Sequence, residues 1–139
     1  MSFLLDTTVV SKWMKPLPDP SVIRWLAEVD EDRVYLSVMT LADLRYGTER
    51  LPAGARRSRL ETWLREELPL RFESRLLIIE ATIAGAWGSV MSRCSAVGRP
   101  IGAMDALFAA TAQVHALTLV TRNVSDFTAS GIFLFNPWS

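Results

Sequence analysis

The sequence is poor in the residues that thiol, imidazole and zinc chemistry require. Its 139 residues include one cysteine, Cys94, and one histidine, His115. A single thiol forms no disulfide within the chain and supplies too few ligands for a cysteine-type zinc site. A cysteine nucleophile would need an activating base beside it, and His115 lies near the end of a different predicted helix. Cys94 is therefore expected to be a buried helix residue rather than a nucleophile.

Long hydrophobic runs are also missing. The longest apolar stretch, 76–87, is interrupted by Glu80 and Thr82 and is shorter than the roughly 20 residues that a membrane span requires. The first residues carry no basic region before their apolar run, which reaches an acid at Asp6, so a secretory signal is not expected. We expect a cytoplasmic protein with no membrane association.

Lysine is scarce and the net charge is zero, although the chain carries 15 basic residues. The two lysines, Lys12 and Lys15, leave arginine as almost the only cation, and the planar guanidinium group suits phosphate oxygens. The cluster 50–59, with four arginines, could contact RNA or could simply be a solvated helix face. Composition does not separate these two interpretations.

What the chain does contain is an ordinary globular composition, with 50% hydrophobic and 22% charged residues. Short apolar segments alternate with helical patterns, which predicts an α/β domain with a mainly parallel sheet flanked by helices, because parallel neighbours need crossover connections. A single domain over 1–139 is the economical interpretation. The expected strands are 3–5, 34–36, 75–78, 118–120 and 132–135; the expected helices include 9–14, a helix starting at Asp19-Pro20, a helix carrying Asp43 with Ser37 or Thr40 as its cap, and 55–67, 80–96 and 106–115.

Four acids stand where an apolar run ends or a helix begins: Asp6, Asp43, Asp105 and Asp126. An unpaired charge is costly to bury, so several acids at the rim of buried segments suggest a cation that makes them tolerable. The hard ion Mg²⁺ prefers such oxygen ligands and can activate water for attack on a phosphodiester. Taken singly, three of these acids could instead serve a helix dipole (Asp43), a helix cap (Asp105) or a turn in the polar loop 121–127 (Asp126).

Other classes that begin with a strand followed by Asp fit less well. Thr8 occupies the position where a haloacid-dehalogenase-type phosphatase has its second Asp, and no lysine follows Lys15 to serve a receiver-type site. No glycine-rich turn follows the first strand, which argues against dinucleotide binding.

Five motifs in order resemble a known family. They are LLDTTVVS at 4–11, TLADLRYG at 40–47, MDALFAATA at 104–112, TRNVSDF at 121–127 and NPW at 136–138. Together they resemble the PIN-domain ribonucleases of the VapC toxin family, in particular its FitB-like branch. The resemblance implies a PIN-like three-layer α/β sandwich and a Mg²⁺-dependent endoribonuclease in which Mn²⁺ can substitute.

The resemblance also implies roles for the acids. Asp6 and Asp105 match the principal metal-binding acids of the family, Asp43 stands where the family generally has Glu, and Asp126 matches a fourth acid of variable position. Thr8 replaces a common Asn beside Asp6. The neighbouring side chains Thr7, Thr8 and Asn123 are expected to orient the carboxylates, with Asn123 standing where some relatives carry an acid.

The implied partners are an RNA substrate and a cognate VapB-like antitoxin, in a homodimer or a heteromeric toxin–antitoxin complex. Two alternatives stay open. A catalytically degraded PIN-fold protein would bind RNA or an antitoxin without cleaving, and a DNA-directed nuclease would cut single-stranded DNA but not RNA.

Overall fold

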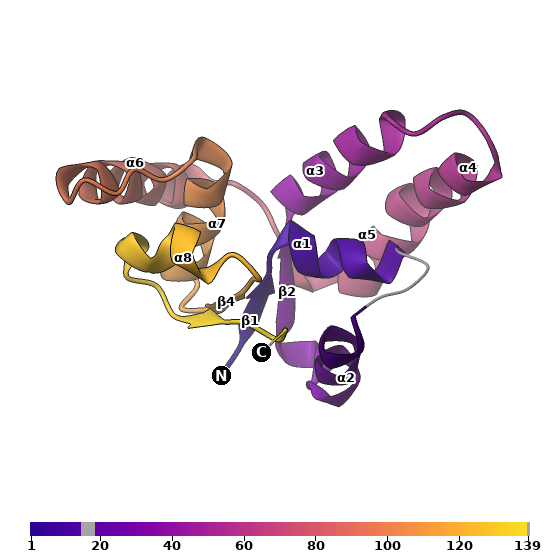
Figure 1. The fold of residues 1–139 in the computed structure, drawn as a ribbon, viewed down its shortest axis with the longest axis horizontal. Helices are drawn as coiled ribbons and strands as arrows, with labels where there is room; N and C mark the ends of the chain where they lie inside the picture. Colours follow the sequence, from indigo (N-terminus) through magenta and orange to yellow (C-terminus); the bar gives the residue numbers. More distant parts are fainter. Residues whose placement is uncertain (15–18, 139) are drawn as a thin grey trace.

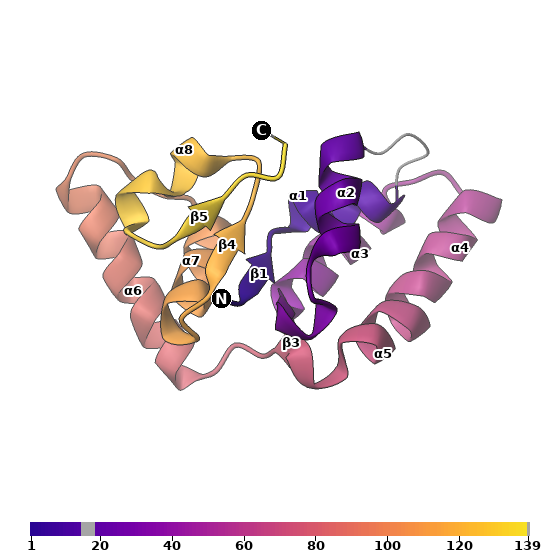
Figure 2. The same ribbon diagram turned by 90° about the horizontal axis from the view of Figure 1, so that it is seen from below.

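The computed structural model describes residues 1–14 and 19–138. Its centre is one five-stranded sheet in the order β3-β2-β1-β4-β5, and all four strand pairings are parallel (Figures 1 and 2). The predicted mainly parallel sheet is therefore confirmed. The strands are β1 (Phe3–Leu5), β2 (Val34–Ser37), β3 (Leu76–Leu77), β4 (Thr118–Val120) and β5 (Leu134–Phe135).

Helices cover both faces of this sheet, which gives the three layers expected of the fold (Figure 2). One face is covered by α1 (Thr7–Val10), α2 (Pro20–Glu28), α3 (Val38–Glu49) and α5 (Leu68–Phe72), and α4 (Ala55–Thr62) packs on α3 further from the sheet. The other is covered by α6 (Ala81–Ala96), α7 (Ala103–Val114) and α8 (Val124–Phe127). Single turns complete the chain: η1 (Ser11–Met14), η2 (Glu31–Arg33), the π-type η3 (Trp63–Glu67), η4 (Glu73–Arg75) and η5 (Thr128–Ser130). No helix in the described ranges is both long enough and apolar enough to cross a membrane.

Two hydrophobic cores form because successive strand residues point to opposite faces of a sheet. Leu4 and Leu119 pack with α6 and α7, whereas Leu5 and Val120 pack with α1, α2, α3 and α5. All four side chains are fully buried. Cys94 lies in the first core at 1% exposure, so the prediction that it is a buried helix residue is confirmed.

Two local expectations differ from the structure, and of the two caps offered for the helix that carries Asp43 the structure selects one. Helix α7 begins at Ala103, three residues earlier than predicted, after Gly102 in extended conformation. The stretch 121–127 is only partly a loop, because Val124–Phe127 form α8 and carry Asp126. Ser37 rather than Thr40 caps α3, accepting a hydrogen bond from the Met39 N–H at 3.1 Å, while Thr40 lies buried inside the helix.

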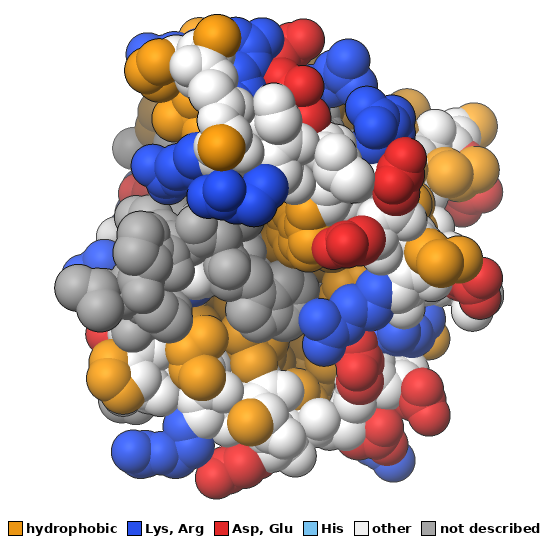
Figure 3. Space-filling view, turned by 90° about the vertical axis from the view of Figure 1, so that its right-hand side faces the viewer, with side chains coloured by type: hydrophobic (Ala, Val, Ile, Leu, Met, Phe, Trp, Pro, Cys, Tyr) orange, Lys and Arg blue, Asp and Glu red, His pale blue; other side chains and the backbone are white. Residues whose placement is uncertain are grey.

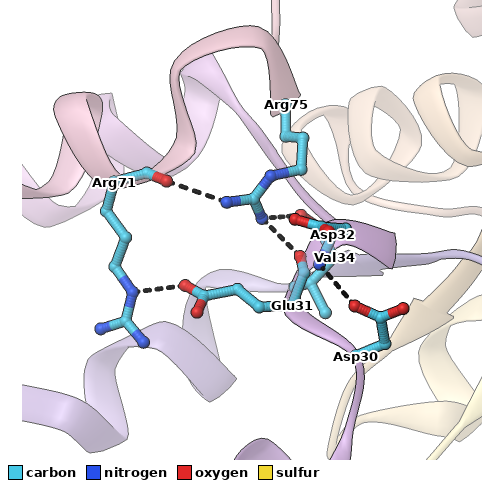
Figure 4. A network of polar contacts seen from close by, with 6 residues as sticks. All are labelled: Asp30, Glu31, Asp32, Val34, Arg71 and Arg75. Carbon is cyan, nitrogen blue, oxygen red and sulfur yellow. Dashed lines mark hydrogen bonds and ion pairs between the residues drawn. The ribbon is translucent and has the colours of Figure 1, made fainter.

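One arginine ties the turn after α5 to the start of β2 (Figure 4). The Arg75 guanidinium donates from Nη1 to the carbonyls of Glu31 and Val34, both at 2.6 Å, and from Nη2 to the carbonyl of Arg71 at 2.8 Å. These carbonyls end a helix or open a strand and would otherwise depend on water. Arg75 thus fixes the edge of the sheet on which β3 pairs with β2.

Replacement of Arg75 by Met is expected to lower the free energy of unfolding by about 1–3 kcal/mol, because three charge-assisted hydrogen bonds to carbonyls, one of them partly buried, are lost together. Chemical denaturation measures the change. The matched control is Arg65→Met, which breaks an ion pair to Glu66 whose side chains are both 62% exposed, and which is expected to cost less than about 0.5 kcal/mol. Equal effects of the two substitutions would show that Arg75 is an ordinary surface residue.

Candidate metal centre

The site lies where the order of the sheet reverses direction. From β1 the chain proceeds outward to β2 and β3, then crosses to the other side of β1 to form β4 and β5. In open parallel sheets this reversal leaves a crevice outside the carboxyl ends of the two strands concerned. Asp6 directly follows β1 and Thr121 directly follows β4, so both side chains are delivered to that crevice.

Asp6 is 6% exposed and is held by two hydroxyl groups. Thr121 Oγ1 donates to Asp6 Oδ2 at 2.7 Å and Thr8 Oγ1 donates to the same oxygen at 3.1 Å. The Asp6 N–H is bonded to the Val120 carbonyl at 2.9 Å, which fixes the backbone as well. No described residue donates to Oδ1, so this oxygen is left for a ligand.

Asp6 does not act as a helix cap, although it occupies the N-cap position of α1. Its side chain accepts no capping hydrogen bond. By contrast, the Asp19 carboxylate accepts from the N–H groups of Ser21 and Val22 at the start of α2. Helix capping therefore explains the position of Asp19, but it does not explain why the Asp6 carboxylate is buried.

Asp43 is brought to the same crevice by α3, which starts directly after β2. Thr7 Oγ1 donates to Asp43 Oδ2 at 2.9 Å and lies 3.4 Å from the hydroxyl oxygen of the buried Thr40. Burial raises the pKa of Asp43 above its ordinary value, the Thr7 hydrogen bond opposes that rise, and the charge of Asp6 adds to it. Asp43 and Asp6 therefore act on each other electrostatically.

Asp105 stands in the first turn of α7 and completes the group. Burial raises the pKa of Asp105, and the charges of Asp6, Asp126 and Asp43 raise it further. The four acids predicted from the sequence thus share one electrostatic environment. Asp105 and the exposed Asp126 also line a polar cavity of about 510 Å³, together with Arg99.

The described part of the chain supplies no ion-pair partner for these four carboxylates. Within residues 1–14 and 19–138 none of them forms an ion pair with Lys, Arg or His. Within the same ranges, no group of three or more His, Cys, Asp or Glu side chains is arranged so that it could already hold a metal ion. Mg²⁺ usually keeps several waters and takes only one or two carboxylates plus substrate phosphates, so an all-oxygen, negatively charged crevice of this kind fits it.

The expected orienting residues lie in different relations to the acids. Thr8 contacts Asp6, and Thr7 contacts Asp43. The exposed Asn123 contributes its backbone N–H, which donates to Thr121 Oγ1 at 3.1 Å, while its side chain makes no hydrogen bond within the described chain.

Sequence reasoning missed two residues of the crevice. Thr121 donates the shorter hydrogen bond to Asp6, and its position directly after a buried strand, like that of Asp6 itself, was the available signal. Arg99 gave no signal, because it lines the cavity from the turn before α7, where its guanidinium group donates to the Ser125 carbonyl at 3.5 Å.

Comparison with known proteins gives concordant matches over nearly the whole chain. The family model described as PIN domain matches residues 3–128. The chain is 36% identical over 135 residues to Toxin FitB of Neisseria gonorrhoeae (strain ATCC 700825 / FA 1090), covering 97% of both chains. It is 34% identical over 135 residues to VapC ribonuclease Y4jK of Sinorhizobium fredii (strain NBRC 101917 / NGR234), covering 97% of this chain and 96% of that one. The solved structure of FitAB bound to an IR36 DNA fragment superposes with a TM-score of 0.94 at 33% identity, covering 99% of this chain and 96% of that chain.

Proposed function

The chain belongs to the PIN-domain family, and from that membership we propose that it is the toxin of a type II toxin–antitoxin pair, an endoribonuclease that hydrolyses RNA phosphodiester bonds. The observation that carries this function is the crevice in which the buried Asp6 and three further acids interact electrostatically, without an ion pair to any residue in the described part of the chain. The names of its relatives support both halves of the proposal, since one is called a toxin and another a VapC ribonuclease.

A divalent metal is a general requirement of PIN-domain VapC nucleases. We propose Mg²⁺, with Mn²⁺ able to substitute, because four carboxylates without nitrogen or sulfur ligands favour a hard ion that accepts oxygen. Asp6 and Asp105 would be its principal ligands, with Asp43 and Asp126 contributing directly or through water. When bound, such an ion neutralises charge on the phosphodiester and acidifies water for the attack.

Three threonine side chains orient two of the proposed metal ligands. Thr8 and Thr121 both donate to Oδ2 of Asp6, which leaves Oδ1 available to the crevice. Thr7 holds Asp43 in the same way through one oxygen. The Asp105 carboxylate has no hydrogen-bonding or ion-pair partner in the described chain. Its orientation can therefore change when metal and substrate bind.

The partners follow from the same family. A VapB-like antitoxin would inhibit the toxin in a heteromeric complex, and the structure of FitAB bound to DNA is consistent with such an assembly. We further propose that the free toxin is a homodimer, that residues 1–139 form a single domain, and that the protein acts in the cytoplasm.

The test is a metal titration of the purified, antitoxin-free protein. After removal of bound metal with a chelator, Mg²⁺ or Mn²⁺ is added to labelled structured RNAs and to single-stranded DNA. RNA cleavage that requires the metal, and that is absent in an Asp6→Asn variant prepared in parallel, is the expected result. The variant also controls for contaminating ribonucleases.

Two outcomes would contradict the proposal. Cleavage confined to single-stranded DNA would make the protein a DNA-directed nuclease. Binding of RNA by a folded wild-type protein, without cleavage under either metal, would make it a binding protein whose catalytic site has degenerated.

A further inference from the structure

A second cavity opens beside the metal centre, on the side where α1, α3 and α4 meet. It has a volume of about 260 Å³, and Thr7 and Asp43 of the metal centre form part of its lining. Figure 3 shows one face of the molecule, on which exposed hydrophobic side chains lie among Lys and Arg and Asp and Glu side chains. A ligand in this cavity would therefore lie next to the reacting phosphodiester.

The walls of the cavity are mostly aliphatic. Leu44 of α3, Leu51 in the turn after α3 and Leu60 of α4 all line it. A flat, weakly polar ring suits such walls, and protein recognition of RNA sequence commonly takes unpaired bases that are turned out of the strand. The volume lies just below the roughly 300 Å³ at which pockets for drug-sized ligands begin, so it has room for one ring system.

One wall residue carries an unused hydrogen-bonding group. Thr48 is 1% exposed, and its hydroxyl oxygen has no hydrogen-bond partner among the described residues. Most buried polar groups in native proteins are paired, and an unpaired one costs about 1–3 kcal/mol. Because this oxygen is buried, a ligand with a polar edge would provide the missing partner once the Thr48 side chain turned its hydroxyl toward the cavity.

The rim offers a cation for a phosphate. Arg56, at the start of α4, lines the cavity. Its guanidinium group forms no ion pair or hydrogen bond with any described residue. Its neighbour Arg57 is instead held by Glu61 at 2.7 Å. Apolar walls with a free guanidinium at the rim match the two parts of a nucleotide, its base and its phosphate.

We infer that this cavity is a nucleobase pocket, which binds one unpaired base of the RNA beside the bond that is cut. The inference rests on the proposed ribonuclease function and adds to it the determinant that places the strand. The base lies between Leu44, Leu51 and Leu60, its polar edge reaches Thr48, and an adjoining phosphate meets Arg56.

Gly47 gives a direct way to fill the pocket. It lies on α3 in the pocket lining, and a side chain built there meets no other atom within 4 Å. Gly47→Leu should therefore occupy the cavity without disturbing the fold, and leucine also favours the helix over glycine. The matched control is Gly88→Leu on α6, another exposed helical glycine with open space around it and outside the pocket.

The experiment measures binding of short single-stranded RNAs to full-length protein in an Asp105→Asn background, which prevents cleavage. Each RNA is also prepared as a set with one base removed at a time. We expect Gly47→Leu to weaken binding by roughly tenfold to a hundredfold, the range for losing one base contact, and Gly88→Leu to leave it unchanged. In the protein with Gly47, removal of one particular base should weaken RNA binding by a similar factor. In the Gly47→Leu protein, whose pocket is filled, removal of the same base should not change RNA binding.

Several results would overturn the inference. Equal binding by the Gly47→Leu and Gly88→Leu proteins would do so, as would an abasic penalty that persists in the filled pocket. If Gly47→Leu left RNA binding intact but abolished neutralisation by the co-expressed antitoxin, the cavity would be a polypeptide site instead. These results differ from the one that would contradict the proposed ribonuclease function, which is that the wild-type protein does not cleave RNA at all.

Discussion

Asp105→Asn is expected to lower metal-dependent RNA cleavage by at least about a hundredfold, because a bound metal supplies several kcal/mol of transition-state stabilisation and this ligand helps to hold it. Asparagine keeps the size of the side chain and removes its charge, so the fold should persist. Single-turnover cleavage rates at saturating RNA, measured over a range of Mg²⁺ concentrations, separate weakened metal binding from a slower reaction. Cleavage at the wild-type rate would remove Asp105 from the centre.

The same substitution should stabilise the metal-free protein at neutral pH. The folded state raises the pKa of Asp105 above its ordinary value of 3.8, through burial and three neighbouring acids. The folded protein therefore holds this proton more tightly than the unfolded chain, so the associated stability is present below pH 3.8 and is lost as the pH rises through the raised pKa. Ionised Asp105 costs stability at pH 7, and asparagine removes that cost.

Thermal unfolding in the presence of a chelator, at several pH values, tests whether Asp105→Asn stabilises the metal-free protein. The Asp105→Asn protein should melt above wild type at pH 7, and the difference should shrink as the pH falls toward 3.8. Asp19→Asn is the matched control, since Asp19 caps α2 away from the crevice and asparagine caps almost equally well. A variant less stable than wild type at pH 7 would mean that Asp105 has a structural role.

Thr121→Val should have the second largest effect on catalysis. Valine matches the shape of threonine but cannot donate to Asp6, so the buried carboxylate loses the shorter of its two hydrogen bonds, at 2.7 Å, and is oriented by Thr8 alone. Residues that orient metal ligands typically contribute roughly tenfold to a hundredfold to metal affinity or activity. We expect a loss of that size, seen in the metal concentration required for half-maximal cleavage.

Thr121→Ser distinguishes orientation from packing. Serine restores the hydroxyl but lacks the methyl group, so it should recover most of the metal affinity even if it unfolds at a slightly lower temperature. If valine preserved the metal requirement and serine did not, the methyl group of Thr121 would matter and its hydrogen bond would not.

The order of strands and helices along the chain was predictable because each strand is a short apolar run followed by a polar turn. Leu4 and Leu5 are buried on opposite faces, which explains why the first run shows no alternation of apolar and polar residues. The start of α7 was misplaced because Gly102 gives no side-chain cap by which to recognise it. Helix α8 was missed because its four residues are too few to show a helical period.

The positions of the four candidate acids were partly predictable: Asp6 follows a strand, and Asp105 and Asp126 stand in first helical turns, whereas Asp43 lies one turn further into α3 than expected. Which hydroxyl holds which carboxylate was not predictable, because these bonds join residues distant in sequence: Thr7 reaches Asp43, and Thr121 reaches Asp6. Residue patterns report local structure, whereas these partners are set by the pairing of β1 with β4 and by the packing of α1 on α3. The cavity beside the metal centre was hidden for the same reason, since its walls come from three separate helical segments.

The reversal of strand order also determines at what stage of its synthesis the protein can complete the proposed metal centre. Asp6 leaves the ribosome early, but Asp105, the Thr121 hydroxyl and Asp126 emerge only late in the chain. Until β4 is made and pairs with β1, the buried end of β1 lacks the neighbour that holds its carboxylate. A chain whose synthesis is interrupted before β4 thus contains Asp6, Asp43 and Asp105 but lacks Thr121 and Asp126, so the proposed metal centre is completed only when the last fifth of the sequence has been made.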